Sequence, residues 1–214
     1  MNDADSIIQV MYDGEICAGR ESSHAMALGS PVWEKFLFPP WSRSKEIKDL
    51  EGQDVQISPV QQLNFVEDDG EALLTLLRIA HLQFKDIPVT PSYDHLLNLA
   101  TLVEHYRCIS IIRPWLATWI ANEETEWKAP GHECWLFIAW ALGRHEVFES
   151  LALKMVKEVV VDADGVTFTS SGKPISQPLP YGILGDSSDQ MLHTSRKLTY
   201  FFFRKYFCSS SSYY

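Results

Sequence analysis

The sequence has few cysteines and no closely spaced pair of them. Its 214 residues include four, none within a C-x-x-C motif: Cys17, Cys108, Cys134 and Cys208. Zinc sites and small disulfide frameworks need cysteines at short, regular spacing, so this distribution argues against both. Reduced thiols are typical of proteins kept in the cytoplasm or the nucleus. We therefore expect a cytoplasmic or nuclear location.

Positive charge is also scarce. The chain has 18 Lys and Arg against 28 Asp and Glu, which gives a formal net charge of −10 at pH 7. Nucleic-acid-binding proteins usually show the opposite balance, because they must neutralise phosphate groups. We therefore expect no nucleic-acid partner.

Long apolar runs are missing as well. The longest, residues 134–142 and 200–203, fall well short of the roughly 20 apolar residues that a membrane-spanning helix needs. The first residues, Met-Asn-Asp-Ala-Asp, are acidic and show no signal-peptide pattern. The sequence therefore predicts a soluble protein with no membrane partner.

Catalytic and metal-binding motifs are absent too. There is no G-x-S-x-G nucleophile motif and no glycine-rich loop for phosphates. His132 and Cys134 are two residues apart, but no second pair of ligands lies at zinc-binding spacing. The Asp-x-Asp-Gly segment at residues 162–165 matches only a fragment of a calcium loop, and a turn explains it. We predict no catalytic residue, no metal and no cofactor, and we do not expect an enzyme.

The first 37 residues predict a β-hairpin followed by two short helices. The apolar segment 6–12 and the segment 15–20 are joined by Asp-Gly, the strongest short hairpin signal. Ser22 or its neighbour Ser23 can cap the first helix, and Ser30 followed by proline begins the second. Gly29 is expected to end the first helix, because glycine tolerates the left-handed geometry of many helix ends.

The rest of the chain predicts one more strand and then mostly helices. Asp68 and Asp69 provide the cap and the negative charge that favour a helix start. The order predicts an α+β fold, with a small sheet capped by helices and a mostly helical extension. The strand lies within residues 53–66, the helices span 71–82, 92–107, 109–122, 133–142, 146–161 and 188–207, a charged linker covers 123–131, and a short extended piece covers 166–169.

Three segments resemble motifs of the BTB/POZ domain. Residues 22–37, Ser-Ser-His-Ala-Met-Ala-Leu-Gly-Ser-Pro-Val-Trp-Glu-Lys-Phe-Leu, resemble the family's "SSxxLxxxSPVF" hallmark. Residues 67–82 continue the resemblance, and Leu-Ala-x-Leu-Val-x-x-Tyr-x-Cys within residues 96–108 is similar to the family's "lAdkY" helix. The helical stretch that follows and the segment 178–184 are similar to BTB-containing proteins of filamentous fungi.

The resemblance implies a three-stranded sheet with about five helices. It places the BTB/POZ domain at residues 5–122 and a helical C-terminal extension at residues 131–207, and we expect residues 208–214 to be a disordered tail. Members of this family bind other proteins, commonly form homodimers, and often serve as substrate adaptors on the cullin scaffold of a ubiquitin ligase.

Two departures from the family pattern bear on these partners. Many dimeric members carry an extra helix before the first strand, whereas this sequence starts almost at the strand, which counts against a homodimer. Members that bind cullin-three carry a hydrophobic-x-Glu motif. At that place this sequence has Phe84-Lys85-Asp86, with the shorter acid.

Three functions follow from these observations. The first is a protein-interaction module, whose candidate contact residues are the aromatic side chains Trp33, Phe36, Phe38 and Trp41. For Trp33 and Phe36, a place in the domain's own core is the alternative. The second is a cullin adaptor that uses Phe84, Asp86 and the helix at 109–122 and that requires Phe84 to be exposed. The third is an enzyme or small-ligand binder in the second half, which would need a pocket with convergent polar groups.

Overall fold

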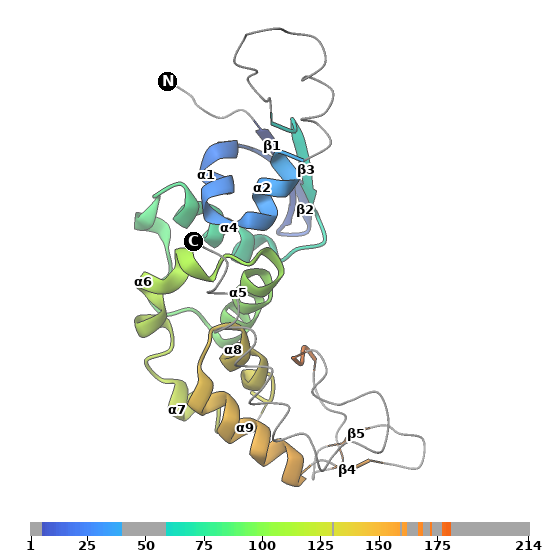
Figure 1. Cartoon of the computed structure of the whole chain (residues 1–214), viewed down its shortest axis with the longest axis vertical. Helices are drawn as coiled ribbons and strands as arrows, with labels where there is room; N and C mark the ends of the chain where they lie inside the picture. Colours follow the sequence, from blue (N-terminus) through green and yellow to red (C-terminus); the bar gives the residue numbers. More distant parts are fainter. Residues whose placement is uncertain are drawn as a thin grey trace, which may run out of the picture. The chain divides into compact units, whose positions relative to one another are not determined.

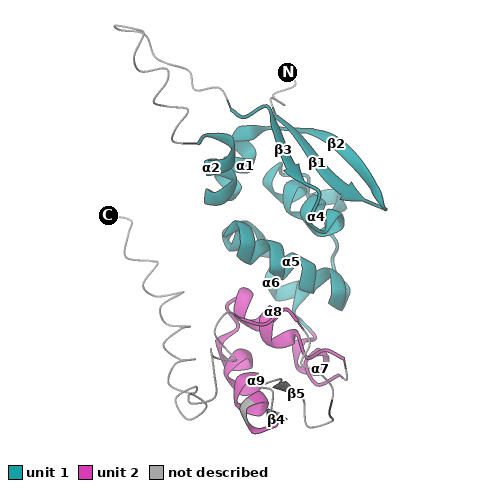
Figure 2. Ribbon diagram, turned by 90° about the vertical axis from the view of Figure 1, so that its right-hand side faces the viewer, with its two compact units in different colours: residues 1–121 teal, residues 122–214 magenta. Residues whose placement is uncertain are grey.

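The computed structural model describes residues 6–39, 59–129, 131–158, 160–161, 167–168, 172 and 177–180. Strands and helices both occur in these ranges, which confirms the predicted α+β class (Figure 1). The chain divides into two compact units, Met1–Ala121 and Asn122–Tyr214 (Figure 2). Within the described ranges, every helix is too short or too polar to serve as a membrane span.

Unit 1 begins with the predicted hairpin. Strand β1 (Ser6–Tyr12) pairs antiparallel with β2 (Glu15–Glu21). The turn between them places Asp13 at φ 52° and Gly14 at φ 80°, the two positive values that a tight hairpin turn of this length favours. Strand β3 (Gln62–Phe65) then joins β1 in parallel, so the sheet order is β2-β1-β3. This strand occupies only the end of the predicted range 53–66, of which residues 53–58 lie outside the described ones.

Two short helices, α1 (Ser23–Gly29) and α2 (Pro31–Leu37), follow the hairpin as predicted. The oxygen of Ser22 accepts a hydrogen bond from the N–H of Ala25, so Ser22 caps α1. Ser30 caps α2.

Gly29 does not end α1 in the left-handed conformation, which corrects the prediction made for it. The residue belongs to the helix, and its φ is not positive. A Cβ built at Gly29 would lie 3.4 Å from the Cβ of Ala80 and 3.7 Å from a methyl group of Ile111. These are ordinary van der Waals distances, so α1 packs on both neighbours here without requiring glycine at this position.

Three longer helices complete the described part of unit 1. Helix α4 (Gly70–Ala80) begins at Asp69, whose carboxylate accepts a hydrogen bond from the N–H of Ala72 at 2.9 Å. Helix α4 packs against β1 (Figure 2). The other elements are the 3-10 turn η1 (Phe84–Asp86), α5 (Tyr93–Tyr106) and α6 (Ile109–Trp119).

Tyr106 joins several of these elements at the centre of unit 1. Its ring centroid lies 5.4 Å from that of Trp33 in α2 and 5.8 Å from that of Phe65 in β3. Its hydroxyl donates a hydrogen bond to the carboxylate of Asp68, in the turn before α4. Unit 1 also holds fully buried apolar side chains, among them Met26, Trp33, Leu37, Leu73, Leu76, Leu99 and Ile112.

Unit 2 is mostly helical in its described part. The predicted linker 123–131 contains a short helix, α7 (Glu123–Glu126), because Arg144 donates two hydrogen bonds to the Glu123 carboxylate and holds that segment. The buried α8 (Trp135–Ala141) packs on α9 (His145–Glu158). The last predicted helix, 188–207, and the tail 208–214 lie outside the described residues.

A short strand replaces the end of the helix predicted over residues 146–161. Strand β4 (Val160–Val161) pairs antiparallel with β5 (Thr167–Phe168), which occupies the predicted extended piece. The β-branched pair at Val160 and Val161 favours this pairing over one further turn of α9.

Candidate functional site: a protein-interaction face

Several apolar side chains are exposed beside the contacts that α1, the end of α4, η1 and α6 make with one another. Leu28 at the end of α1 is 88% exposed, Leu82 just after α4 is 74% exposed, and Phe84 in η1 is 51% exposed. Ile111 and Trp115 of α6 are partly exposed and lie one helical turn apart. We call these five residues the α1–α6 face.

The elements that carry the face are in contact with one another. Gly29 lies close to both Ala80 and Ile111, which brings together the ends of α1 and α4 and the start of α6. At the other end of α1, the Nε2 of His81 accepts a hydrogen bond from the N–H of Ser22 at 3.1 Å. The end of α4 is therefore fixed against α1 at both ends of that short helix.

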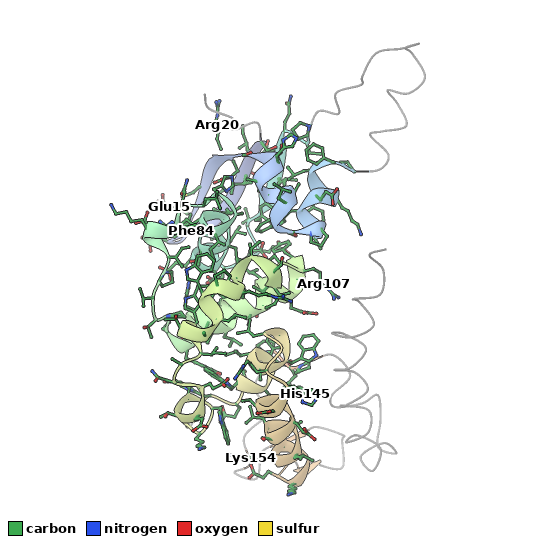
Figure 3. The ribbon with its side chains drawn as sticks, turned by 60° about the vertical axis from the view of Figure 1, so that its left-hand side comes forward. Glu15, Arg20, Phe84, Arg107, His145 and Lys154 are labelled. Atoms are coloured by element: carbon green, nitrogen blue, oxygen red, sulfur yellow. The ribbon has the colours of Figure 1, made fainter. Side chains whose placement is uncertain are left out.

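The turn that carries Phe84 is held against α6. The rings of Phe84 and Trp115 lie 5.3 Å apart between centroids. The indole N–H of Trp119 donates a hydrogen bond to the carbonyl oxygen of Pro88 at 2.8 Å, which fixes the rest of the loop. Figure 3 shows Phe84 at the surface of unit 1. Phe84 thus packs one side of its ring on α6 and leaves the other accessible to a partner.

Charged groups border this apolar surface. A guanidinium nitrogen of Arg78 lies 3.3 Å from the carbonyl oxygen of Asp86, to which it donates a hydrogen bond. The side chains of Lys85 and Asp86 are exposed. An apolar centre with a polar border is the usual composition of a protein–protein interface.

His81 also faces the carboxylate of Glu21 next to the face. Its Nδ1 lies 2.8 Å from the carbonyl oxygen of Leu77, and its Nε2 lies 3.1 Å from a Glu21 oxygen. Burial raises the pKa of Glu21. These contacts tie the β2–α1 junction to α4.

The predicted contact residues separate into a core group and a surface group. Trp33 packs against the ring of Tyr106 and is fully buried. It therefore belongs to the core and is not a contact residue. Phe36 is 43% exposed and meets the ring of Tyr106 edge-on, and Phe38 is half-buried beside the ring of His24. Trp41 lies outside the described residues. Phe84 and Asp86 are both exposed on η1.

Sequence reasoning missed Leu28 and Leu82 as members of a surface. Leu28 lies within the first predicted helix, and Leu82 is the last residue of the helix predicted over 71–82. The high exposure of both depends on how α1, α4 and α6 meet. The local sequence carries no direct signal for that arrangement, except that α4 ends without a glycine.

One side-chain cluster has the composition of a nucleophilic triad. The Nε2 of His95 lies 3.3 Å from the hydroxyl of Thr75, and its Nδ1 lies 3.8 Å from the Glu71 carboxylate. Thr75 is buried, however, and its hydroxyl donates to the carbonyl oxygen of Glu71 within the same helix at 3.0 Å. That proton is not directed at His95, so the cluster joins α4 to α5 rather than presenting a nucleophile.

In the part of the chain that the structure describes, no three His, Cys, Asp or Glu side chains are grouped so that they could hold a metal ion. No model of a known protein family matches the sequence, and no curated protein matches it either.

Proposed function

We propose that this chain is a non-catalytic protein-interaction module of the BTB/POZ type, and that it binds a partner protein through the α1–α6 face. The observation that carries the proposal is the contact between the half-exposed ring of Phe84 in η1 and Trp115 of α6, beside further exposed apolar side chains of unit 1. Exposed apolar surface costs free energy in water, and burial against a partner recovers it.

The BTB/POZ assignment is supported by the roles of the motif residues. Ser22 and Ser30 cap the two short helices of the segment that resembles the family hallmark. Tyr106 of the third motif is the residue around which α2, β3 and the start of α4 pack. The order of strands and helices in the described part of unit 1 agrees with the fold that the resemblance implies.

A second candidate function is a substrate adaptor on a cullin scaffold. It requires an accessible Phe84, and that side chain is 51% exposed. The neighbouring Asp86 supplies a carboxylate at the place of the motif's glutamate, on a side chain one methylene shorter.

Affinity capture of the tagged full chain from an extract of its native cells tests both functions. The double variant Phe84→Ala/Asp86→Ala removes the exposed ring and the carboxylate of η1. Leu153→Ala, which changes an exposed leucine in unit 2, is the matched control. A protein captured by the wild type and by the control, but lost with the double variant, supports the interaction module.

The identity of the captured protein separates the two candidates. A cullin in this set supports the adaptor. Other proteins without a cullin contradict the adaptor and leave a scaffold or regulator. Capture that is insensitive to the double variant contradicts the use of the α1–α6 face.

A further inference from the structure

Two titratable side chains meet where β2, α1 and the end of α4 come together. Glu21 is the last residue of β2, Ser22 caps α1, and His81 directly follows α4. One carboxyl oxygen of Glu21 lies 3.1 Å from the Nε2 of His81, and only 21% and 14% of these two side chains are exposed. A contact between polar groups with so little access to water depends strongly on which of them carries a proton.

The hydrogen bonds of His81 assign its tautomer. Its Nδ1 lies 2.8 Å from the carbonyl oxygen of Leu77, which can only accept, so Nδ1 carries a proton. Its Nε2 lies 3.1 Å from the backbone N–H of Ser22, which can only donate, so this nitrogen presents a lone pair. With both bonds made, His81 is neutral and holds its proton on Nδ1.

The contact with Glu21 then requires one further proton. An ionised carboxylate can only accept, and at 3.1 Å it would face the lone pair of Nε2. A protonated carboxyl group donates to that lone pair, and burial favours this form because it raises the pKa of Glu21. If the proton moves to Nε2, an ion pair forms and the N–H of Ser22 loses its acceptor. In both arrangements one proton lies between the two side chains.

The other charged or titratable groups on the elements that pack here have contacts elsewhere or are exposed. Arg78 of α4 donates to the carbonyl oxygen of Asp86, and the Nδ1 of His24 in α1 lies 3.3 Å from the hydroxyl of the preceding serine. Contacts with other side chains engage His95, Glu104, His105 and Tyr106. The exposed groups are Tyr12, Glu15, Cys17, Arg20, Glu71, Lys85, Asp86, Asp94, Arg107 and Arg113. Among the described residues, an ion-pair distance connects Glu21 to His81 alone.

We propose that Glu21 and His81 form a pH-sensitive switch, in which one shared proton holds the β2–α1 junction against the end of α4 and loss of that proton at rising pH releases the junction. The switch connects α1, which carries Leu28, to the end of α4, next to Leu82. It goes beyond the proposed function and does not depend on the partner that the α1–α6 face binds.

The direction of the pH dependence follows from a comparison with the unfolded chain. There glutamic acid and histidine have pKa values of about 4.3 and 6.5, so above about pH 6.5 neither holds the proton that the folded pair shares. The folded state therefore binds one more proton than the unfolded state, and stability falls as pH rises. This contribution is complete just below about pH 6.5 and is lost as the folded pair releases its proton.

The variant Glu21→Gln tests the shared proton in urea unfolding of the full chain at pH 6 and pH 8.5. A glutamine N–H donates to Nε2 at both pH values without titrating. Between them, the folded-to-unfolded ratio of the wild type should fall about tenfold relative to that of the variant, which corresponds to a pKa about one unit higher in the folded pair. Glu71→Gln is the matched control and should follow the wild type, because it removes an exposed carboxylate 3.8 Å from another histidine, His95.

Two results of this comparison would overturn the proposal. Equal pH profiles of the wild type and Glu21→Gln would show that no proton is shared in this range. A Glu21→Gln variant that is less stable than the wild type at pH 8.5 would show that the ionised carboxylate supports the fold.

Nuclear magnetic resonance of the wild-type chain tests the switch without a substitution. The carboxyl carbon of Glu21, the ring nitrogens of His81 and the amide of Ser22 should change together with one midpoint above about pH 6.5, while Nδ1 keeps its proton. Separate midpoints of about 4.3 for Glu21 and about 6.5 for His81 would overturn the shared proton. An amide of Ser22 that does not follow the pair would overturn the release of the junction.

Discussion

The hydroxyl of Ser30 donates a hydrogen bond to the carbonyl oxygen of Tyr106 at 2.5 Å, across 76 positions of sequence. The hydroxyl oxygen of Ser30 also accepts hydrogen bonds from the N–H groups of Val32 and Trp33, at 3.1 and 3.0 Å. One buried serine therefore caps α2 and satisfies a carbonyl group at the end of α5. A local capping signal is in this way coupled to the tertiary structure.

Ser30→Ala should destabilise the protein by about 2 kcal/mol, since it removes a helix cap and leaves a buried carbonyl oxygen without this donor. Urea unfolding measures the difference. Ser22→Ala is the matched control, because Ser22 caps α1 through a single, longer bond of 3.5 Å. Ser22→Ala should lower the free energy of unfolding by less than about 1 kcal/mol. Equal losses in the two variants would contradict the double role of Ser30.

Tyr106→Phe should change how the free energy of unfolding depends on pH under alkaline conditions. Burial, together with the hydrogen bond to Asp68, raises the pKa of Tyr106. Above about pH 10 an unfolded tyrosine loses its proton while the folded one keeps it, so the folded state binds more protons and stability falls as pH rises. The stabilising contribution of this group is complete below that pH.

The measurement is the free energy of unfolding between pH 8 and pH 11, for the wild type and for Tyr106→Phe. The variant should be less stable by about 2 kcal/mol at pH 8, because it lacks the hydrogen bond to a carboxylate. It should also lose less stability than the wild type towards pH 11. Parallel pH profiles would show that Tyr106 does not cause the alkaline decline.

Gly70→Ala should destabilise unit 1 strongly. A Cβ built at Gly70 would overlap the carbonyl oxygen of Met11, so β1 and α4 would have to move apart. We expect a loss of about 1–3 kcal/mol, as for other overpacked sites. Gly19→Ala is the control, since a Cβ there makes only ordinary contacts, the nearest at 3.7 Å. A loss at Gly70 no larger than that at Gly19 would rule out this close approach.

The cysteines should differ in their reactivity. Cys17 is exposed on β2, whereas Cys108 is fully buried, and burial raises the pKa of its thiol to about 12. Because the thiolate is the reactive form, Cys108 should resist a thiol reagent at pH 8 until the protein unfolds. Cys17→Ser should remove one rapidly reacting thiol from the native protein, and Cys108→Ser should remove none. Rapid labelling of Cys108 would contradict its burial.

The features that sequence reasoning predicted correctly depend on short-range interactions. The Asp13-Gly14 turn and the serine caps act over two to four residues, so their residue types indicate the structure directly. Helix α1 ends at Gly29 as predicted, but without the left-handed conformation, because the next residue, Ser30, is extended and begins α2. The residue type of Gly29 indicates a helix end but not its backbone geometry.

The same distinction explains the outcome for the candidate site. Phe84 and Asp86 came from a motif resemblance, and the structure places both at the surface. Trp33 could not be separated from surface aromatics by pattern, because its burial depends on Tyr106, far along the chain. The exposure of Leu82 accompanies its left-handed backbone at the end of α4, which the residue type does not indicate.

The position of Tyr106 in the chain has a consequence for synthesis. Its ring packs against Trp33 and Phe65, its hydroxyl donates to Asp68, and its carbonyl oxygen accepts from Ser30. Segments that are synthesised early therefore lack these contacts until Tyr106 has been synthesised. The hairpin and the first helices can form as they leave the ribosome, but they lack this cover until position 106 has emerged. A nascent chain halted before that point exposes its central aromatic residues, and chaperones would recognise it as unfinished.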